Sequence, residues 1–229
     1  MKYLWILLTI VVIIAGLVFF WPSSNDKTSN VNNNSDAAIE GGNTDATENV
    51  LIIGDEDAKV TIVEYGDFKC PTCTAFHQFA GAEIRQNYIE GGLVRILFRT
   101  LPIIGPDSPR AAQAAYCANE QGMFTEFHDS VFDYMHNNYY NAGNIAAEFQ
   151  DILTTSQLKT LADSAELDSK VLGECVESGK FESIVKRDIE IANINGANGT
   201  PTFFVGDQKV TGFQQFSVFK TLIELQLNR

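Results

Sequence analysis

The order of apolar patterns along the chain predicts an α/β fold that carries an inserted block of helices. Three observations lead to this fold class. An apolar strand runs directly into a helix that begins at two closely spaced cysteines. A long helical stretch follows the second strand, and a short hairpin with a final helix closes the chain.

The first strand and helix are expected in residues 60–90. Residues 60–65 form an apolar run typical of a buried strand, and the helix that follows is expected to end at Gly91-Gly92. Residues 94–101 alternate apolar side chains with arginines, which indicates a second strand with one buried face.

Ser108 and Pro109 predict the start of the first inserted helix, with the serine hydroxyl as N-cap and the proline at the first helical position. The pattern remains helical to about residue 193. The expected elements that follow are a strand at 202–205, a two-residue turn at 206–207, a strand at 209–211 and a helix at 215–227.

The segment Cys70-Pro71-Thr72-Cys73 places two thiols at the junction between the first strand and its helix. The first thiol then meets the unpaired N–H groups of the helix start, which favour a thiolate, and we expect its sulfur to be exposed. The second thiol lies one turn further on the same face, within reach of a disulfide. Such a pair can cycle between a dithiol and a disulfide.

Two other interpretations of this cysteine pair are a zinc half-site and a structural disulfide. A zinc site needs two further ligands at short spacing. The other cysteines stand far away and singly, and none of His77, His128 and His136 belongs to a ligand pair in the sequence. We therefore expect redox chemistry, with neither a metal nor a cofactor.

The N-terminus predicts a membrane segment followed by a linker. Lys2 precedes nineteen uncharged, mostly apolar residues, 3–21, which is enough to span a bilayer. We expect residues 1–22 to be an uncleaved anchor, with the body outside the cytoplasm; the alternative is a cleaved signal segment and a secreted or periplasmic protein. Residues 23–49 have the polar composition of a flexible linker.

The net charge and the cysteine content limit which partners and which cellular compartment suit the chain. The formal net charge of −13 argues against nucleic acid, because phosphates would be repelled. The four cysteines form an even set, which suits an oxidising compartment. For Cys117 and Cys175 two interpretations remain open: free buried thiols, which are common, or a structural disulfide, which this compartment favours.

Three stretches of the sequence resemble the DsbA family of extracytoplasmic thiol–disulfide oxidoreductases: residues 64–73, 114–124 and 199–205. The resemblance covers residues 50–227 and is greatest for the membrane-anchored members of Gram-positive type. It implies a thioredoxin-like fold with an inserted α-helical domain at about residues 106–195.

The resemblance also implies roles for the residues of the cysteine motif. Cys70 corresponds to the nucleophile that forms the mixed disulfide, and Cys73 to the resolving thiol. Pro71 and Thr72 correspond to the residues that tune the redox potential. The strongest oxidants of the family have histidine where this chain has Thr72, so we expect a milder oxidant.

Two more site residues follow from the family. Thr200-Pro201 corresponds to a cis peptide bond beside the sulfurs that binds substrate as an added strand, although an ordinary turn would also explain this proline. Glu64 corresponds to a buried acid beneath the motif that exchanges a proton with Cys73. From the sequence alone, Glu64 could equally point outward.

The leading hypothesis is an anchored oxidase that passes disulfides to exported proteins with thiols and is reoxidised by a membrane redox partner. A reductase or isomerase would use the same chemistry with the pair reduced at rest. A non-catalytic binding domain with the same fold is the third hypothesis, but it would need neither Cys70, Cys73 nor Pro201.

Overall fold

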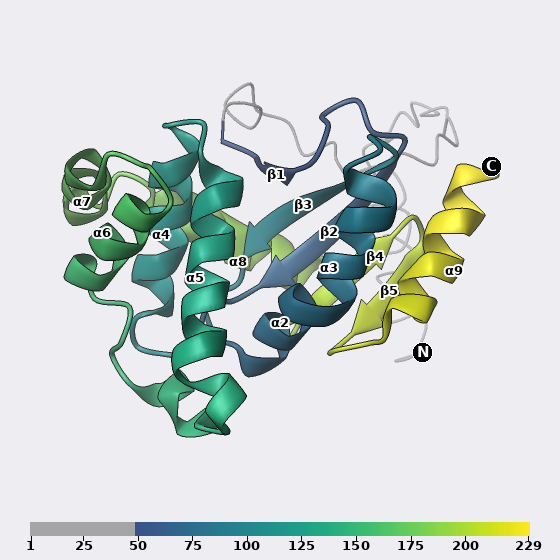
Figure 1. Cartoon of the computed structure of the whole chain (residues 1–229). Coiled ribbons are helices and arrows are strands. Elements are labelled where there is room, and N and C mark those ends of the chain that lie inside the picture. The colour runs from purple at the N-terminus through teal and green to yellow at the C-terminus, as the bar shows by residue number, and fades with distance from the viewer. Residues whose placement is uncertain (1–48) are drawn as a thin grey trace, which may run out of the picture. The chain divides into compact units, whose positions relative to one another are not determined.

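The computed structural model describes residues 49–229 and shows a five-stranded sheet with helices on both faces (Figure 1). The strand order is β1-β3-β2-β4-β5. The strands are β1 (Leu51–Ile53), β2 (Val60–Gly66), β3 (Val94–Thr100), β4 (Thr202–Val205) and β5 (Gln208–Thr211). Only β2 and β3 are parallel, so the crossover between them needs a helix, which is where the cysteines lie.

That crossover is one continuous helical segment with two wider turns. It consists of α2 (Pro71–Phe76), a π-helical turn (His77–Gly81), α3 (Ala82–Ile84) and a second π-helical turn (Arg85–Ile89). The helix expected in this region is therefore present. The π-helical turns were not expected, because the 3.6-residue apolar period does not reveal one extra residue in a turn.

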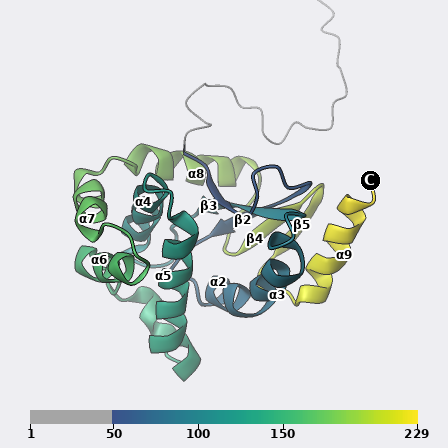
Figure 2. The ribbon, with the colours of Figure 1, turned by 45° about the horizontal axis from the view of Figure 1, so that its top comes forward.

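The insertion between β3 and β4 is helical, as expected. It contains α4 (Ser108–Asn119), α5 (Phe124–Asn138), α6 (Thr155–Ser164), α7 (Ser169–Ser178) and α8 (Glu182–Ile194), with 3₁₀ turns at Tyr140–Ala142 and Ile145–Phe149. Helices α4 to α7 gather at one end of the sheet, whereas α8 runs along one of its faces (Figure 2). The final helix is α9 (Phe216–Leu227).

Alternation along β2 divides the core into two layers. Tyr65 faces α8 and packs against Ala192 and Ala197. On the other face, Phe203 of β4 packs against Phe76 of α2 and Phe219 of α9, with ring centroids 4.4 and 4.9 Å apart. Because side chains alternate along a strand, Glu64 points away from α8, toward the layer that contains α2.

One buried carboxylate, that of Asp188 on α8, ties the insertion to the sheet. It accepts hydrogen bonds from the backbone N–H of Thr100 at 3.1 Å and from the Tyr116 hydroxyl, and it pairs with Arg99 at 3.0 Å. Burial and the neighbouring Asp188 charge raise the pKa of the Tyr116 phenol well above its ordinary value, so this hydroxyl remains a donor. The contacts join the end of β3 to both α4 and α8.

The hairpin prediction is confirmed, one local prediction needs correction and one strand was not predicted. Val205 pairs with Gln208, which leaves Gly206-Asp207 as the two-residue turn, and Gly206 adopts a φ of +57°. The N-cap of α4 is Asp107 rather than Ser108, because the Ser108 hydroxyl accepts from the N–H of Gly105 instead of capping the helix. Strand β1 was not predicted, since three apolar residues are too short for a pattern.

The fold class expected from the sequence, a thioredoxin-like α/β fold with an inserted α-helical domain, is thus confirmed. The proposed membrane segment and nearly all of the linker, with their boundaries at residues 22 and 49, lie outside the described residues. Within residues 49–229, no helix is long and apolar enough to cross a membrane.

Cys117 on α4 and Cys175 on α7 are joined by a disulfide that closes a loop over a sequence separation of 58. We expect the double variant Cys117→Ala/Cys175→Ala to lose about 4 kcal/mol of unfolding free energy, because the unfolded chain regains the entropy of that loop. Urea unfolding followed by circular dichroism measures the change, with the Cys70–Cys73 pair oxidised in both proteins. An unchanged unfolding midpoint would contradict a structural role for the bond.

Candidate active site

The turn between β2 and α2 is shaped by the side chain of Asp67. Its carboxylate accepts hydrogen bonds from the backbone N–H groups of Lys69, Ile103 and Ile104 at 2.9, 2.8 and 2.9 Å. The backbone N–H of Cys70 in turn donates to the Asp67 carbonyl at 3.0 Å. These contacts hold Cys70 at the N-cap of α2, with Pro71 at the start of the helix where no N–H is needed.

Cys70 is an unbonded thiol whose sulfur is surrounded by hydrogen-bonding groups. It lies 3.0 Å from the Thr72 hydroxyl and 3.4 Å from the Thr200 carbonyl oxygen. The hydrogen bond from the Cys73 thiol, followed by the effects of the neighbouring Thr200 and Thr72, outweighs burial and lowers the pKa of Cys70 to about 6. Cys70 is therefore mainly a thiolate at neutral pH.

The expectation that the Cys70 sulfur is exposed is wrong. Cys70 is only 3% exposed, close to the 0% of Cys73. The sequence suggested exposure because N-cap positions usually face solvent, but the Thr200-Pro201 segment of another part of the chain lies over the sulfur. The difference between the two thiols lies in their hydrogen bonds rather than in their accessible area.

Cys73 and Glu64 form the interior side of the site. Burial, together with the proximity of Cys70, raises the pKa of the Cys73 thiol well above its ordinary value. Glu64 on β2 is 3% exposed, and burial followed by the charge of Cys70 raises the pKa of its carboxyl to about 8. The structure thus places Glu64 inside the protein rather than at its surface, and the acid is largely protonated at neutral pH.

The segment before β4 completes the site from the far end of the sequence. The Thr200–Pro201 peptide bond is cis, and the Pro201 carbonyl accepts a hydrogen bond from the N–H of Gly212 at 2.8 Å. Thr202 then pairs with Tyr65, so β4 is anchored directly beside the strand that precedes the cysteines. This register brings Thr200 to Cys70.

Two residues that sequence reasoning missed, Lys69 and Asp107, attach the insertion to the cysteine loop. The Lys69 ammonium is fully buried, pairs with Asp107 at 3.1 Å and donates to the Gln150 carbonyl at 2.5 Å. The Tyr140 hydroxyl donates to the Lys69 carbonyl at 2.5 Å. A lysine next to a reactive cysteine gives no sign in the sequence that it is buried, because lysine is rarely buried.

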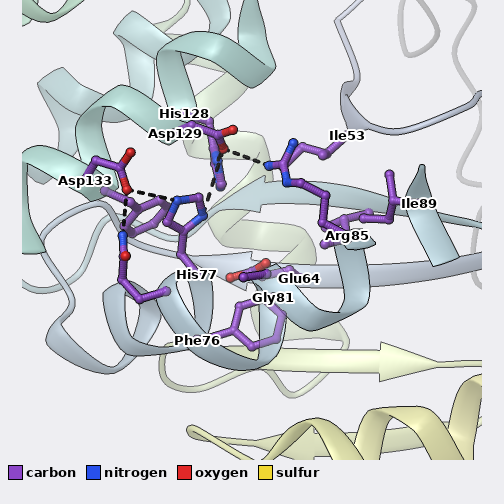
Figure 3. A pocket seen from close by; sticks show the side chains of 14 residues that line it. Ile53, Glu64, Phe76, His77, Gly81, Arg85, Ile89, His128, Asp129 and Asp133 are labelled. Atoms are coloured by element: carbon purple, nitrogen blue, oxygen red, sulfur yellow. Dashed lines mark hydrogen bonds and ion pairs between the residues drawn. The ribbon is translucent and has the colours of Figure 1, made fainter. Parts of the chain in front are cut away.

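A second group of polar side chains lies beside the redox site, in a cavity of about 260 Å³ (Figure 3). His77, His128 and Asp129 meet there, and Glu64 also lines the cavity. Spacing along the sequence, where no two histidines form a ligand pair, does not reveal this cluster. His77 and His128 are far apart in the sequence but are brought together where the first π-helical turn packs against α5.

The geometry defines a class of protein: a thioredoxin-fold enzyme with a low-pKa thiol, a buried partner thiol and a cis-proline segment beside them. The family model described as thioredoxin matches residues 46–225. The chain belongs to the thioredoxin family, in its DsbA-like group of thiol–disulfide oxidoreductases.

Three relatives illustrate the match. Disulfide bond formation protein D of Bacillus subtilis is 28% identical over 179 residues, which are 77% of this chain and 76% of that protein. The crystal structure of oxidised BdbD from Bacillus subtilis has a TM-score of 0.70 and 27% identity, covering 80% of this chain and 95% of that one. The Na⁺/H⁺ antiporter NhaA 3 of Salinispora tropica is 31% identical over 161 residues, 69% of this chain but only 22% of that longer protein.

The asymmetry of the two thiols can be measured by alkylation. In the reduced protein we expect Cys70 to react with a midpoint near pH 6 and Cys73 to react slowly. In the Cys73→Ala variant the Cys70 midpoint should rise toward the ordinary thiol value of about 8.5, because the hydrogen bond that lowers its pKa most is lost. Peptide mass spectrometry after timed iodoacetamide treatment assigns each rate. Equal rates for the two cysteines would contradict the assignment.

Proposed function

We propose that the protein is an oxidase that introduces disulfides into exported proteins through the Cys70-Pro71-Thr72-Cys73 pair. The observation that carries the proposal is the contrast between the two thiols: the pKa of Cys70 is lowered to about 6 and that of Cys73 is raised. A stabilised Cys70 thiolate favours the reduced form of the pair. A pair whose reduced form is stabilised is an oxidant toward other thiols.

The proposed reaction begins with the Cys70–Cys73 disulfide. A client thiolate attacks the Cys70 sulfur, a client–Cys70 disulfide forms, and Cys73 leaves as a thiolate that takes up a proton. A second client thiolate then attacks the client sulfur and expels the Cys70 thiolate. The client loses two electrons and gains a disulfide, while the enzyme pair is reduced to the dithiol. The low pKa of Cys70 makes it a good leaving group in the second step.

Glu64 is proposed as the proton donor and acceptor for Cys73. Its carboxyl is mostly protonated at neutral pH, and its charge interacts with both thiols. It can supply the proton when Cys73 leaves. It can accept one when Cys73 attacks during reoxidation of the dithiol by a membrane redox partner.

Thr200 and Pro201 are proposed to bind the client. They lie against the Cys70 sulfur at the start of β4, and an extended client segment placed there could pair with their backbone groups. Main-chain pairing gives affinity with little side-chain selectivity, which suits an enzyme that acts on many unfolded clients.

We further propose that residues 1–22 anchor the enzyme in the membrane and that residues 23–49 tether the domain outside the cytoplasm. The apolar composition of the first segment and the polar composition of the second support this. The Cys117–Cys175 disulfide fits an oxidising compartment. Relatives named disulfide bond formation protein fit the direction of the reaction.

A reductase or isomerase is the second candidate, and one observation favours it. Thr72, which corresponds to histidine in the strongest oxidants of the family, stabilises Cys70 with a neutral hydroxyl 3.0 Å away instead of a positive charge. The proposed enzyme is accordingly a milder oxidant, with Pro71 and Thr72 setting its potential.

We expect Glu64→Gln to slow the reaction with clients by about 10- to 100-fold while it stabilises the fold. The Glu64 pKa is raised to about 8 in the folded protein, so wild-type stability falls as pH rises from about 4.5 to 8, where only the unfolded chain has released the proton. The variant should lack this slope and gain about 3 kcal/mol near pH 7. Stopped-flow oxidation of a reduced peptide and urea unfolding at several pH values measure both effects.

The exposed Glu83 on α3, in the helical segment that follows the cysteines, offers a control for the loss of a glutamate charge. Glu83→Gln removes the same charge at the surface and should change neither the rate nor the pH slope. If the Glu64→Gln enzyme reacts at the wild-type rate at every pH, the proposed role of Glu64 in proton transfer is contradicted.

Cys73→Ala is expected to trap clients on the enzyme. The lone Cys70 thiolate can attack a client disulfide, which forms a Cys70–client disulfide and expels one client thiolate. No Cys73 thiol is then present to release the client, so adducts should accumulate in cells that express the variant. Non-reducing electrophoresis of acid-quenched extracts detects them, and they should vanish with reductant and in Cys70→Ala/Cys73→Ala. Adducts that persist without Cys70, or a lack of adducts, would contradict the proposed reaction with protein clients.

Acid-quenched extracts of cells that express the wild-type protein decide between oxidase and reductase. After alkylation of free thiols, the wild-type Cys70–Cys73 pair should be mostly a disulfide at rest. A pair that is mostly reduced at rest would contradict the oxidase proposal and support the reductase or isomerase.

A further inference from the structure

The cavity beside the redox site contains nitrogen and oxygen donors from two helical segments (Figure 3). His77 comes from the π-helical turn His77–Gly81, and His128 and Asp129 come from α5. One donor atom from each residue can be chosen so that all three lie within 4.8 Å of one another. Figure 3 shows His77 lying between the Asp129 and Asp133 carboxylates.

The distances between these donors are close to those in a tetrahedral metal site. The Asp129 Oδ1 atom lies 2.9 Å from His128 Nδ1 and 3.9 Å from His77 Nδ1. Ligands bound at about 2.0–2.1 Å in a tetrahedron are about 3.4 Å apart, so side-chain shifts on the order of 1 Å would suffice.

Both imidazole rings are held in place before any metal binds. The His77 ring stacks on Phe132 with centroids 5.4 Å apart, and its other nitrogen, Nε2, lies 3.5 Å from Asp133 Oδ1. A carboxylate on the far nitrogen is the usual partner of a metal-binding histidine. The His128 ring packs edge to face against the rings of Phe68 and Phe132, with centroids 5.9 and 4.8 Å apart.

We propose that this cavity is a binding site for a divalent transition-metal ion of the Zn²⁺ class, with His77 Nδ1, His128 Nδ1 and the Asp129 carboxylate as ligands. Two imidazoles and one carboxylate suit Zn²⁺ and its neighbours, whereas Ca²⁺ and Mg²⁺ prefer oxygen ligands. With three protein ligands, the fourth coordination position of a tetrahedral ion would be available to water.

Arg85 controls the affinity of this site. Its guanidinium lies 2.9 Å from the same Asp129 Oδ1 atom that faces both histidines. A bound metal ion would have to displace this cation from the carboxylate. Removal of the guanidinium should therefore strengthen metal binding, which a merely structural histidine cluster does not predict.

The test uses the full chain with Cys70 and Cys73 replaced by serine, so that the dithiol cannot bind the metal. Zn²⁺ is titrated by calorimetry with excess Ca²⁺ present, and Co²⁺ serves as a spectroscopic probe of nitrogen and oxygen ligation. His77→Gln should weaken Zn²⁺ binding at least tenfold, Asp133→Asn should weaken it about tenfold, and Arg85→Gln should strengthen it. His136→Gln, on the same helix as His128 but outside the cluster, is the matched control and should leave binding unchanged.

Arg85→Gln keeps all three proposed ligands, so a gain in Zn²⁺ affinity in this variant cannot result from misfolding. Thermal unfolding of each variant shows whether a loss of binding comes from a lost ligand or from a lost fold. The proposal is overturned if neither the parent protein nor Arg85→Gln binds Zn²⁺. It is also overturned if His77→Gln binds as tightly as the parent, or if His136→Gln loses as much affinity as His77→Gln. None of these results depends on disulfide exchange, because the reactive cysteines are absent from the test protein.

Discussion

The buried carboxylate of Asp67 joins the chain segments on which the cysteine site depends. It accepts hydrogen bonds from the backbone N–H of Lys69, in the turn after β2, and from those of Ile103 and Ile104 after β3. These bonds hold the ends of the two parallel strands together. Burial raises the pKa of this carboxyl, and the hydrogen bonds oppose the shift. The turn that Asp67 holds ends at Cys70, so this side chain contributes directly to the position of the Cys70 sulfur.

Similar burial has different consequences for the three ionisable groups of the site. Cys70 is nearly as buried as Cys73, yet its pKa is lowered, first by the hydrogen bond from the Cys73 thiol and then by its neighbours Thr200 and Thr72. Cys73 lacks comparable partners, and burial raises its pKa. Glu64 follows Cys73 in this respect, because burial raises the pKa of its carboxyl to about 8. The chemistry therefore comes from hydrogen bonding within a region that is desolvated throughout.

The helical insertion supports the active site as well as covering it. Its Asp107 binds the buried Lys69 ammonium, and its Tyr140 binds the Lys69 carbonyl, one residue before Cys70. Its helix α5 supplies His128 and Asp129 to the cavity beside Glu64. The insertion and the sheet thus share the same buried polar groups, so movement of one would disturb the other.

The sequence by itself determined the strand–helix order, the helical insertion and the hairpin, and it singled out Cys70 and Cys73 as the candidate pair, because these depend on local periodicity and on spacing along the chain. It did not reveal β1, a strand of three residues that is stabilised by its pairing with β3. Nor did it reveal that Lys69 is buried. Only the tertiary structure decided that Cys70 is covered by Thr200, that Glu64 points inward and that His77 meets His128. Each of these depends on contacts between segments far apart in the sequence. Burial and hydrogen bonding, which set the pKa of a group, arise only when such segments pack together.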